Sequence, residues 1–199
     1  VTSDGSMLYY TARRNDGMGN ENKQSLDAYR EDVYKAEYID GGWYDVGNIG
    51  EPINTYTHDA TVGISFDAKT LFIYRFSLAD GGDIYYSKYQ DDMWLEPERF
   101  PKTINTEFHE SSACFSPDEK VMFFVSDKPG GIGGRDIYYA KRLRNGGWGR
   151  AYNLGNEVNT PFDDHSVYMH PDGRTIYFSS KGHSSIGGYD IFKTTLRKG

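Results

Sequence analysis

Three tryptophans divide this chain into repeats. Trp43, Trp94 and Trp148 are separated by 51 and 54 residues, and an Asn-Thr pair follows each of them eleven residues later, at 54–55, 105–106 and 159–160. A short run that begins Asp-(Val/Ile)-(Tyr/Phe) precedes each Trp, and a fourth copy of this run begins at Asp190. A period of about 50 residues indicates a fold built from copies of one small unit.

Each repeat can be divided into four short strands. In the last repeat, residues 164–170 alternate, a Pro-Asp-Gly turn follows at 171–173, and residues 175–179 and 190–194 form two more strands. In the earlier repeats a fourth strand carries the Trp. Aromatic residues make up 16% of the chain and there are 23 Gly, which favours strands joined by tight turns. The sequence therefore predicts an all-β fold, a β-propeller with four-stranded antiparallel blades.

The repeats cover approximately residues 1–55, 56–106, 107–160 and 161–199, and we predict a single propeller domain or segment over 1–199. The first repeat has no counterpart of the first strand and the last has none of the fourth, which gives three and a half to four blades. Propellers usually have about four to eight blades. Either the two incomplete repeats form one composite blade, or the sequence is a segment of a larger propeller; we favour the segment.

The stretch from Trp148 to Phe192 carries a longer pattern, W-x4-NLG-x2-VNT-x2-DD-x-S-x4-PDGRTIYFSS followed by GGYDIF. This pattern resembles the TolB-type, WD-repeat-like propellers of Bacteroidota envelope proteins, among them OmpA-family, PorE-like lipoproteins of type IX secretion. The resemblance covers essentially the whole chain, more strongly over 107–199 than over 1–106. It implies a protein–protein interaction scaffold in the periplasm, associated with the outer membrane, with outer-membrane or peptidoglycan-associated protein partners.

Acidic residues recur at the start of the first strand, at Asp59, Glu110 and Asp164. The innermost strands of a propeller line its central channel, so these acids could form a ring that binds a cation or a polar ligand. Because an acid stands at this position in each of these repeats, we interpret the three as structural hydrogen-bond acceptors.

His58 and His109 precede two of these acids, and in the next repeat His165 follows Asp164. Imidazole and carboxylate groups together can bind a divalent metal, and a TolB-like lyase that cleaves uronate oligomers gives this idea a precedent by resemblance. The alternative function is therefore a glycan-binding or metal-dependent glycan-cleaving propeller that uses the central channel. The spacing of these residues follows from the repeat itself, which argues for a structural role instead. The main expectation is no metal, no cofactor and no catalytic residue.

One loop departs from the repeat. The turn Asp and the third-strand Asp are 16 or 18 residues apart in three repeats but 28 apart in the first, and the additional residues lie within 13–31. Long insertions in a repeat scaffold are often functional. We therefore predict a partner-binding loop, with a helical turn at 25–30. Its expected binding residues are Arg13, Arg14, Asn15, Asp16, Asn20, Glu21 and Tyr29.

Two Gly-rich loops, at 128–136 and 181–190, are each followed by a strand rather than by a helix, which argues against a phosphate-binding loop. We expect their Gly to adopt positive φ, and the Asp that ends each loop to accept hydrogen bonds from its own turn. The aromatic residues are expected to pack between blades, and Cys114 to be a small buried apolar residue.

Charge and hydropathy argue against nucleic-acid binding and against a membrane-spanning helix. The formal net charge is −7, which disfavours binding to a phosphate backbone. The sequence contains no apolar run of about 18 residues, so no transmembrane helix is expected.

Overall fold

The computed structural model describes residues 1–21, 23, 28–77 and 81–196, and it divides into two compact units. Unit 1 is Val1–Arg99 and unit 2 is Phe100–Gly199. The described residues form strands and turns without an α-helix, which confirms the all-β prediction. Within the same residues there is no apolar helix of membrane-spanning length.

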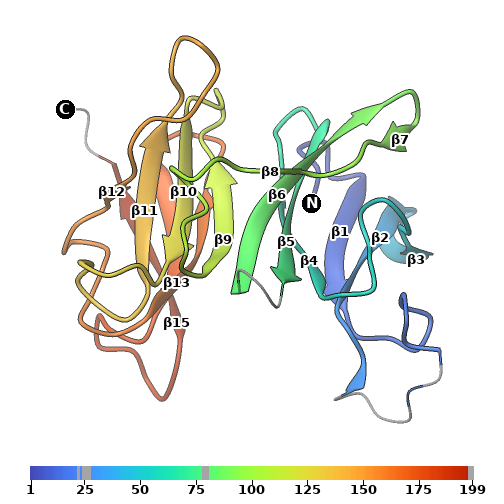
Figure 1. The fold of residues 1–199 in the computed structure, drawn as a ribbon, viewed down its shortest axis with the longest axis horizontal. Coiled ribbons are helices and arrows are strands. Elements are labelled where there is room, and N and C mark those ends of the chain that lie inside the picture. The colour runs from blue at the N-terminus through green and yellow to red at the C-terminus, as the bar shows by residue number, and fades with distance from the viewer. Residues whose placement is uncertain (22, 24–27, 78–80, 197–199) are drawn as a thin grey trace. The chain divides into compact units, whose positions relative to one another are not determined.

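Unit 1 contains two antiparallel sheets, which we call blade 1 and blade 2 (Figure 1). Blade 1 has the order β1-β2-β3, with β1 at Met7–Ala12, β2 at Asp32–Ile39 and β3 at Gly42–Asn48. Blade 2 has the order β4-β5-β6, and both β7 and β8 pair with β6. Its strands are β4 at Asp59–Ile64, β5 at Thr70–Ser77, β6 at Gly81–Gln90, β7 at Met93–Trp94 and β8 at Glu98–Arg99.

Unit 2 contains blade 3, in the order β9-β10-β11-β12, and blade 4, in the order β13-β14-β15 (Figure 1, yellow to red). The strands of blade 3 are β9 at Glu110–Phe115, β10 at Val121–Ser126, β11 at Asp136–Lys141 and β12 at Tyr152–Asn153. The strands of blade 4 are β13 at Asp164–Met169, β14 at Thr175–Ser180 and β15 at Asp190–Thr195. The predicted four-stranded antiparallel pattern is confirmed in blades 2 and 3, and blades 1 and 4 have three strands each among the described residues.

The fourth strand is interrupted in blades 2 and 3. In blade 2, Trp94 pairs with Tyr89 through β7, and the chain pairs with β6 again at β8. In blade 3, Trp148 forms an isolated bridge with Arg142 before β12 begins. Each fourth strand therefore pairs with its blade at two places. A short stretch without pairing, which follows the Trp, separates them.

The turn that precedes β1, β5, β10 and β14, the second strand of each repeat, has one residue in the left-handed region. This residue is Gly5, Ala68, Glu119 or Gly173, with φ of 73°, 58°, 54° and 66°. The Asp before it accepts hydrogen bonds from neighbouring groups; Asp172, for example, accepts the amides of Arg174 and Thr175, each at 2.8 Å. The turn chemistry is thus the same in all four blades, although only two of them use glycine.

Each unit has its own apolar core between its two blades. In unit 1, Val33 and Ile53 of blade 1 pack with Leu71 and Ile73 of blade 2. In unit 2, the cluster consists of Phe123, Val125, Ile137, Val158, Val167, Met169, Ile176 and Phe178. Cys114 is partly buried against this second cluster, and burial raises the pKa of its thiol to about 12.

Aromatic packing between blades is confirmed for Trp94, whose ring meets that of Tyr9 in blade 1 edge-on, with 5.8 Å between the ring centroids. Trp43 differs. It is 42% exposed, and its ring contacts Tyr38 of the same blade, with the ring centroids 5.1 Å apart. The repeat places the three tryptophans at equivalent sequence positions, but they do not have equivalent surroundings.

Candidate functional site

The three recurring acids are fully buried at the first residues of β4, β9 and β13. Each carboxylate accepts two hydrogen bonds from the Thr four residues earlier, one from its backbone N–H and one from its hydroxyl. For Asp59 the distances from Thr55 are 2.7 and 2.6 Å, and for Glu110 the distances from Thr106 are 2.7 and 2.8 Å. The Asn-Thr pair of each repeat therefore ends beside the acid of the next.

The same carboxylates are also bound by the second strand of their own blade. Ser126 donates to Glu110 at 2.6 Å and Ser180 donates to Asp164 at 2.5 Å. In blade 2 the equivalent residue is Arg75, whose Nε donates to Asp59 at 2.6 Å in a largely buried ion pair. Burial raises the pKa of Asp164, although its hydrogen bonds act in the opposite direction. The donors thus come from equivalent positions of the repeat, although Arg75 stands where the other two blades have Ser.

The Asn of the pair binds the third strand of the preceding blade. Asn54 accepts the N–H of Val33 and donates to its carbonyl, both at 2.8 Å, and Asn159 does the same with Ile137. A second Asn, six residues earlier, accepts from the same amide group: Asn48 for Asn54 and Asn153 for Asn159. We call segments 48–55 and 153–160 the latches, because each connects the two blades of its unit.

The Asp at the start of the third strand binds the loop that precedes it. Asp136 accepts the amides of Ile132 and Gly133, and Asp190 accepts the amide of Ile186. The bonds run backward into the Gly-rich loop, whereas an Asx turn would run forward. In blade 2 the equivalent residue is Asp83, and its carboxylate forms an ion pair with Arg99 at 2.6 Å.

Positive φ in the Gly-rich loops is confirmed at Gly130 and Gly187, both at 86°. At Gly133 the reason for glycine is not a positive φ. A Cβ there would collide with the carbonyl oxygens of Thr160 and Phe162, so this loop lies directly against the chain that follows the latch. Lack of a side chain is needed at Gly133 for close approach.

The two histidines of the metal hypothesis lie in different units. Nδ1 of His58 accepts the N–H of Glu31 at 3.3 Å, and it lies 3.8 Å from a carboxylate oxygen of the same Glu31. The backbone N–H of His109 donates to Asp127 at 2.9 Å. Among the described residues, no group of three or more His, Cys, Asp and Glu side chains could hold a metal ion.

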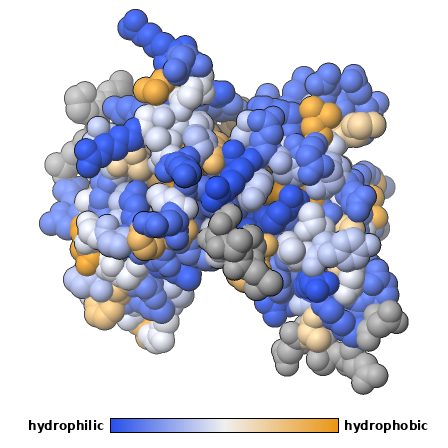
Figure 2. Space-filling model, in the orientation of Figure 1, coloured by the Kyte–Doolittle hydropathy of each residue, from blue (hydrophilic) through white to orange (hydrophobic). Residues whose placement is uncertain are grey.

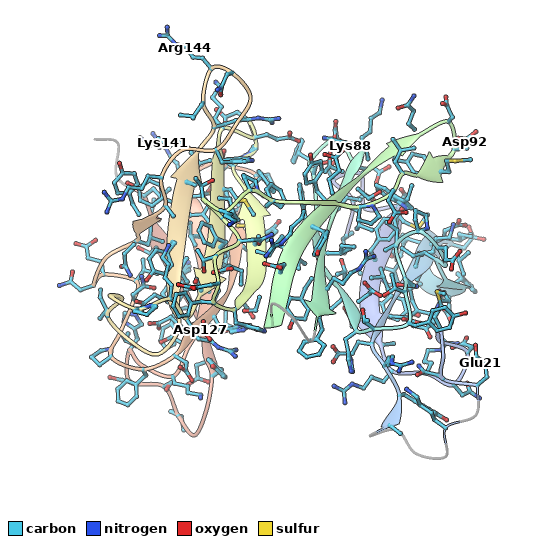
Figure 3. All side chains as sticks on the ribbon, viewed as in Figure 1. Glu21, Lys88, Asp92, Asp127, Lys141 and Arg144 are labelled. Atoms are coloured by element: carbon cyan, nitrogen blue, oxygen red, sulfur yellow. The ribbon has the colours of Figure 1, made fainter. Side chains whose placement is uncertain are left out.

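The predicted partner-binding loop leaves blade 1 between β1 and β2, and Glu21 marks its position in Figure 3. Its exposed residues are Arg13, Asn15, Asp16 and Glu21, and Arg14 and Tyr29 are half-buried. Arg14 is bound to the blade: it forms an ion pair with Asp45 of β3 at 2.5 Å and lies over the ring of Tyr34. The predicted helical turn at 25–30 falls largely outside the described residues.

Asn20 corrects one part of this prediction, because its side chain is fully buried and is not available to a partner. Its amide group donates to the carbonyls of Arg14 and Arg30, and its oxygen accepts the N–H of Arg30. The backbone of the same loop also binds blade 1, since the N–H of Met18 donates to Asp32 at 2.6 Å. The loop is therefore closed by Asn20 and attached to the third strand.

Sequence reasoning missed an exposed apolar hairpin. The exposed apolar side chains of β2 and β3 are Tyr38, Ile39, Trp43, Tyr44 and Val46. The signal was present in the run of aromatic residues around Trp43, but its repeat position predicted packing between blades. The face drawn in Figure 2 is mostly hydrophilic, with apolar residues in small separate groups.

No family model matches the chain, and no curated protein matches it. Solved structures do share its fold. TolB from Acinetobacter baumannii aligns with a TM-score of 0.61 at 16% identity, over 98% of this chain and 39% of that one. An α-L-arabinanase from Penicillium chrysogenum, complexed with arabinobiose, aligns with a TM-score of 0.52 at 11% identity, over 94% of this chain and 65% of that one.

These similarities confirm a TolB-like β-propeller fold. The chain spans about two fifths of TolB and slightly less than two thirds of the arabinanase. At this level of identity the likeness concerns the fold alone, and one fold can carry unrelated functions.

Proposed function

We propose that this chain is a non-catalytic protein–protein interaction scaffold of the Gram-negative cell envelope, and that the insertion at residues 13–31 contacts the partner. The observation that carries this proposal is the contrast between repeating and non-repeating residues. The acids Asp59, Glu110 and Asp164 are buried and bound by groups of the repeat. The insertion has no counterpart in the other blades, and it exposes charged and polar side chains.

The proposed location and class of partner rest on the sequence pattern between Trp148 and Phe192. Its resemblance to envelope propellers of Bacteroidota supports a periplasmic location at the outer membrane, in or beside the type IX secretion machinery. Partners would then be outer-membrane or peptidoglycan-associated proteins. The TolB-like fold of the chain is the fold that this assignment requires.

The test is a crosslinking pull-down from native cell envelopes with an insertion variant, Asn15→Arg with Glu21→Arg. Both side chains are exposed, so the change adds local positive charge with little effect on folding. The matched control is Arg144→Glu, at the tip of the loop after β11 (Figure 3). The proposal expects stoichiometric envelope proteins with the wild type and the control, and their loss with the insertion variant. Equal capture by all three proteins would overturn the assignment of the face.

The second candidate is a glycan-binding or metal-dependent glycan-cleaving propeller. Two observations favour testing it: the fold is shared with an arabinanase, and Trp43, Tyr38 and Tyr44 expose aromatic rings on which a sugar could stack. Arabino-oligosaccharides would be titrated into the protein while Trp fluorescence and the melting temperature are followed. A saturable change that is lost in Trp43→Ala would support a glycan function, and no change in either signal would count against it.

A further inference from the structure

The residue that follows the buried acid of the first strand differs in every repeat. It is Ala60 in blade 2, Ser111 in blade 3 and His165 in blade 4. In unit 2 the two polar versions meet, because Oγ of Ser111 on β9 lies 3.1 Å from Nε2 of His165 on β13. These two strands lie side by side (Figure 1), so the contact is formed between blades 3 and 4.

A second hydroxyl binds the other nitrogen of the same ring. Oγ of Ser166 lies 2.9 Å from Nδ1 of His165. Ser166 has a φ of 50°, and a non-glycine residue in this region often marks a functional site. Among the described residues, neither serine hydroxyl makes another hydrogen bond. We call Ser111, His165 and Ser166 the hydroxyl–imidazole array; Ser111 and His165 are half-buried.

Protonation of His165 changes what the array offers to a ligand. A neutral imidazole has one N–H and one lone pair, so it donates to one serine and accepts from the other. A protonated imidazole has two N–H groups and donates to both serines, which leaves both hydroxyl hydrogens available to an external acceptor. A ligand with two acceptor oxygens and a negative charge would then be bound by both hydroxyls and would stabilise the imidazolium between them.

The charges around the array favour an anion. Burial lowers the pKa of the His165 imidazole, Arg135 and His109 lower it further, and Asp163 acts in the opposite direction. Asp163 is already paired with Lys181, whose Nζ lies 2.8 Å from its carboxylate. The positive field at His165 therefore exceeds the negative one, and a bound anion would oppose it.

The other titratable groups at this place are engaged within the protein. Glu110 and Asp164 are fully buried and accept hydrogen bonds from the threonines and serines of their own surroundings. The ring of Tyr189 meets the imidazole edge-on, with 6.1 Å between the ring centroids. None of these groups supplies the array with a counter-ion.

We propose that Ser111, His165 and Ser166 form a binding site for a carboxylate group, which binds together with a proton taken up by His165. Two hydroxyl donors and one positive charge match the two oxygens and the single charge of a carboxylate. A phosphate group carries more charge than one imidazolium balances. The array lies in unit 2, so the proposal does not depend on the insertion at 13–31 in unit 1.

The experiment uses the full chain and formate, the smallest carboxylate, as the probe. The His165 ring would be titrated by NMR from about pH 4 to about pH 8, in sodium formate and in sodium chloride of equal ionic strength. His165→Gln assigns the resonance, and His170, exposed beside Asp172, is the internal reference. The variants are Ser111→Ala, its matched control Ser112→Ala on the same strand, and Arg135→Gln.

The proposal expects formate to raise the midpoint of the His165 titration saturably by about half a pH unit or more, which is about a threefold preference for the protonated ring. The midpoint of His170 should not move. The effect should be lost in Ser111→Ala and kept in Ser112→Ala, with melting temperatures that show both variants to be folded. In Arg135→Gln the midpoint without formate should rise, and the shift caused by formate should be smaller.

Three results would overturn the proposal: no shift with formate, an equal shift with chloride, or a shift that persists in Ser111→Ala. Two peptides, acetyl-Gly-Asp-Gly-amide and its Asn counterpart, then distinguish the sources of the carboxylate. A shift with the Asp peptide alone of the two would support an acidic segment of a protein as the ligand. A shift with formate but with neither peptide would support a small organic acid.

Discussion

Thr160 donates both its backbone N–H and its hydroxyl to the buried carboxylate of Asp164, and the two residues belong to different blades of unit 2. With Asn159 bound to Ile137 one residue earlier, a single dipeptide connects β11 to β13. We therefore expect the stability of unit 2 to depend measurably on the hydroxyl of Thr160.

Thr160→Val removes this hydroxyl and keeps the shape of the side chain. A buried acceptor that loses a donor costs about 1–3 kcal/mol, so we expect the free energy of unfolding to fall by that amount. Urea unfolding followed by fluorescence measures it. Thr195→Val, at an exposed position of β15, is the control and should change stability by less than about 0.5 kcal/mol. Equal effects of the two variants would contradict the prediction.

Stability should fall on mild acidification because of His165. Burial, with Arg135 and His109 nearby, lowers the pKa of its imidazole, while Asp163 acts weakly in the opposite direction. Protonation is then easier in the unfolded chain, so stability is lost as the pH falls below about 6.5 toward the lower folded pKa. The free energy of unfolding at pH 7 and at pH 5 tests this. In His165→Gln the difference should shrink, and an unchanged difference would assign the pH dependence to other groups.

Ala68→Gly should stabilise the protein. Ala68 has a φ of 58°, and Gly occupies the same turn position at Gly5 and Gly173. Relief of left-handed strain outweighs the added freedom of the unfolded chain, and we expect a gain of up to about 1 kcal/mol. Thermal unfolding of this variant and of the reverse change, Gly173→Ala, measures the effect. The two variants should shift the melting temperature in opposite directions.

Asn20→Ala should destabilise the insertion and the blade that carries it. The change removes the two hydrogen bonds to the carbonyls of Arg14 and Arg30 and the one from the N–H of Arg30. We expect a loss of about 1–3 kcal/mol, since buried backbone groups would lose their partners. Asn15→Ala is exposed and serves as the control. If both variants are as stable as the wild type, the insertion is held by other contacts.

Cys114 should react slowly with thiol reagents in the folded protein. Burial raises the pKa of its thiol to about 12, so almost no reactive thiolate is present at pH 8. The rate of reaction with an aromatic disulfide, measured with and without urea, tests this expectation. A fast reaction in the absence of urea would show that β9 opens readily.

The sequence predicted the strands well because the repeat supplies several aligned copies of every turn and strand. In blade 4 the predicted strands 164–170, 175–179 and 190–194 differ from β13, β14 and β15 by one residue at one end. The recurring Asn-Thr pair marked the latches, although its hydrogen bonds across blades came only from the structure.

Where one repeat differs from the others, prediction failed for physical reasons. Asn20 lies in a loop that has no second copy, so no pattern could show that its amide group is used internally. Trp43 shares its sequence position with Trp94, but only Trp94 meets a ring of a neighbouring blade in its unit. Burial of such residues depends on what lies beside the blade, which repeat position does not encode.

The latches also determine the number of cooperative units in which this molecule unfolds. By sequence, Asn159 and Thr160 belong to the third repeat, but their bonds hold the third and fourth blades at once. Melting either blade breaks the same bonds, so the two share one opening free energy, and the same holds for blades 1 and 2 through Asn54 and Thr55. Four repeats therefore give at most two independent cooperative transitions, one for each pair of blades.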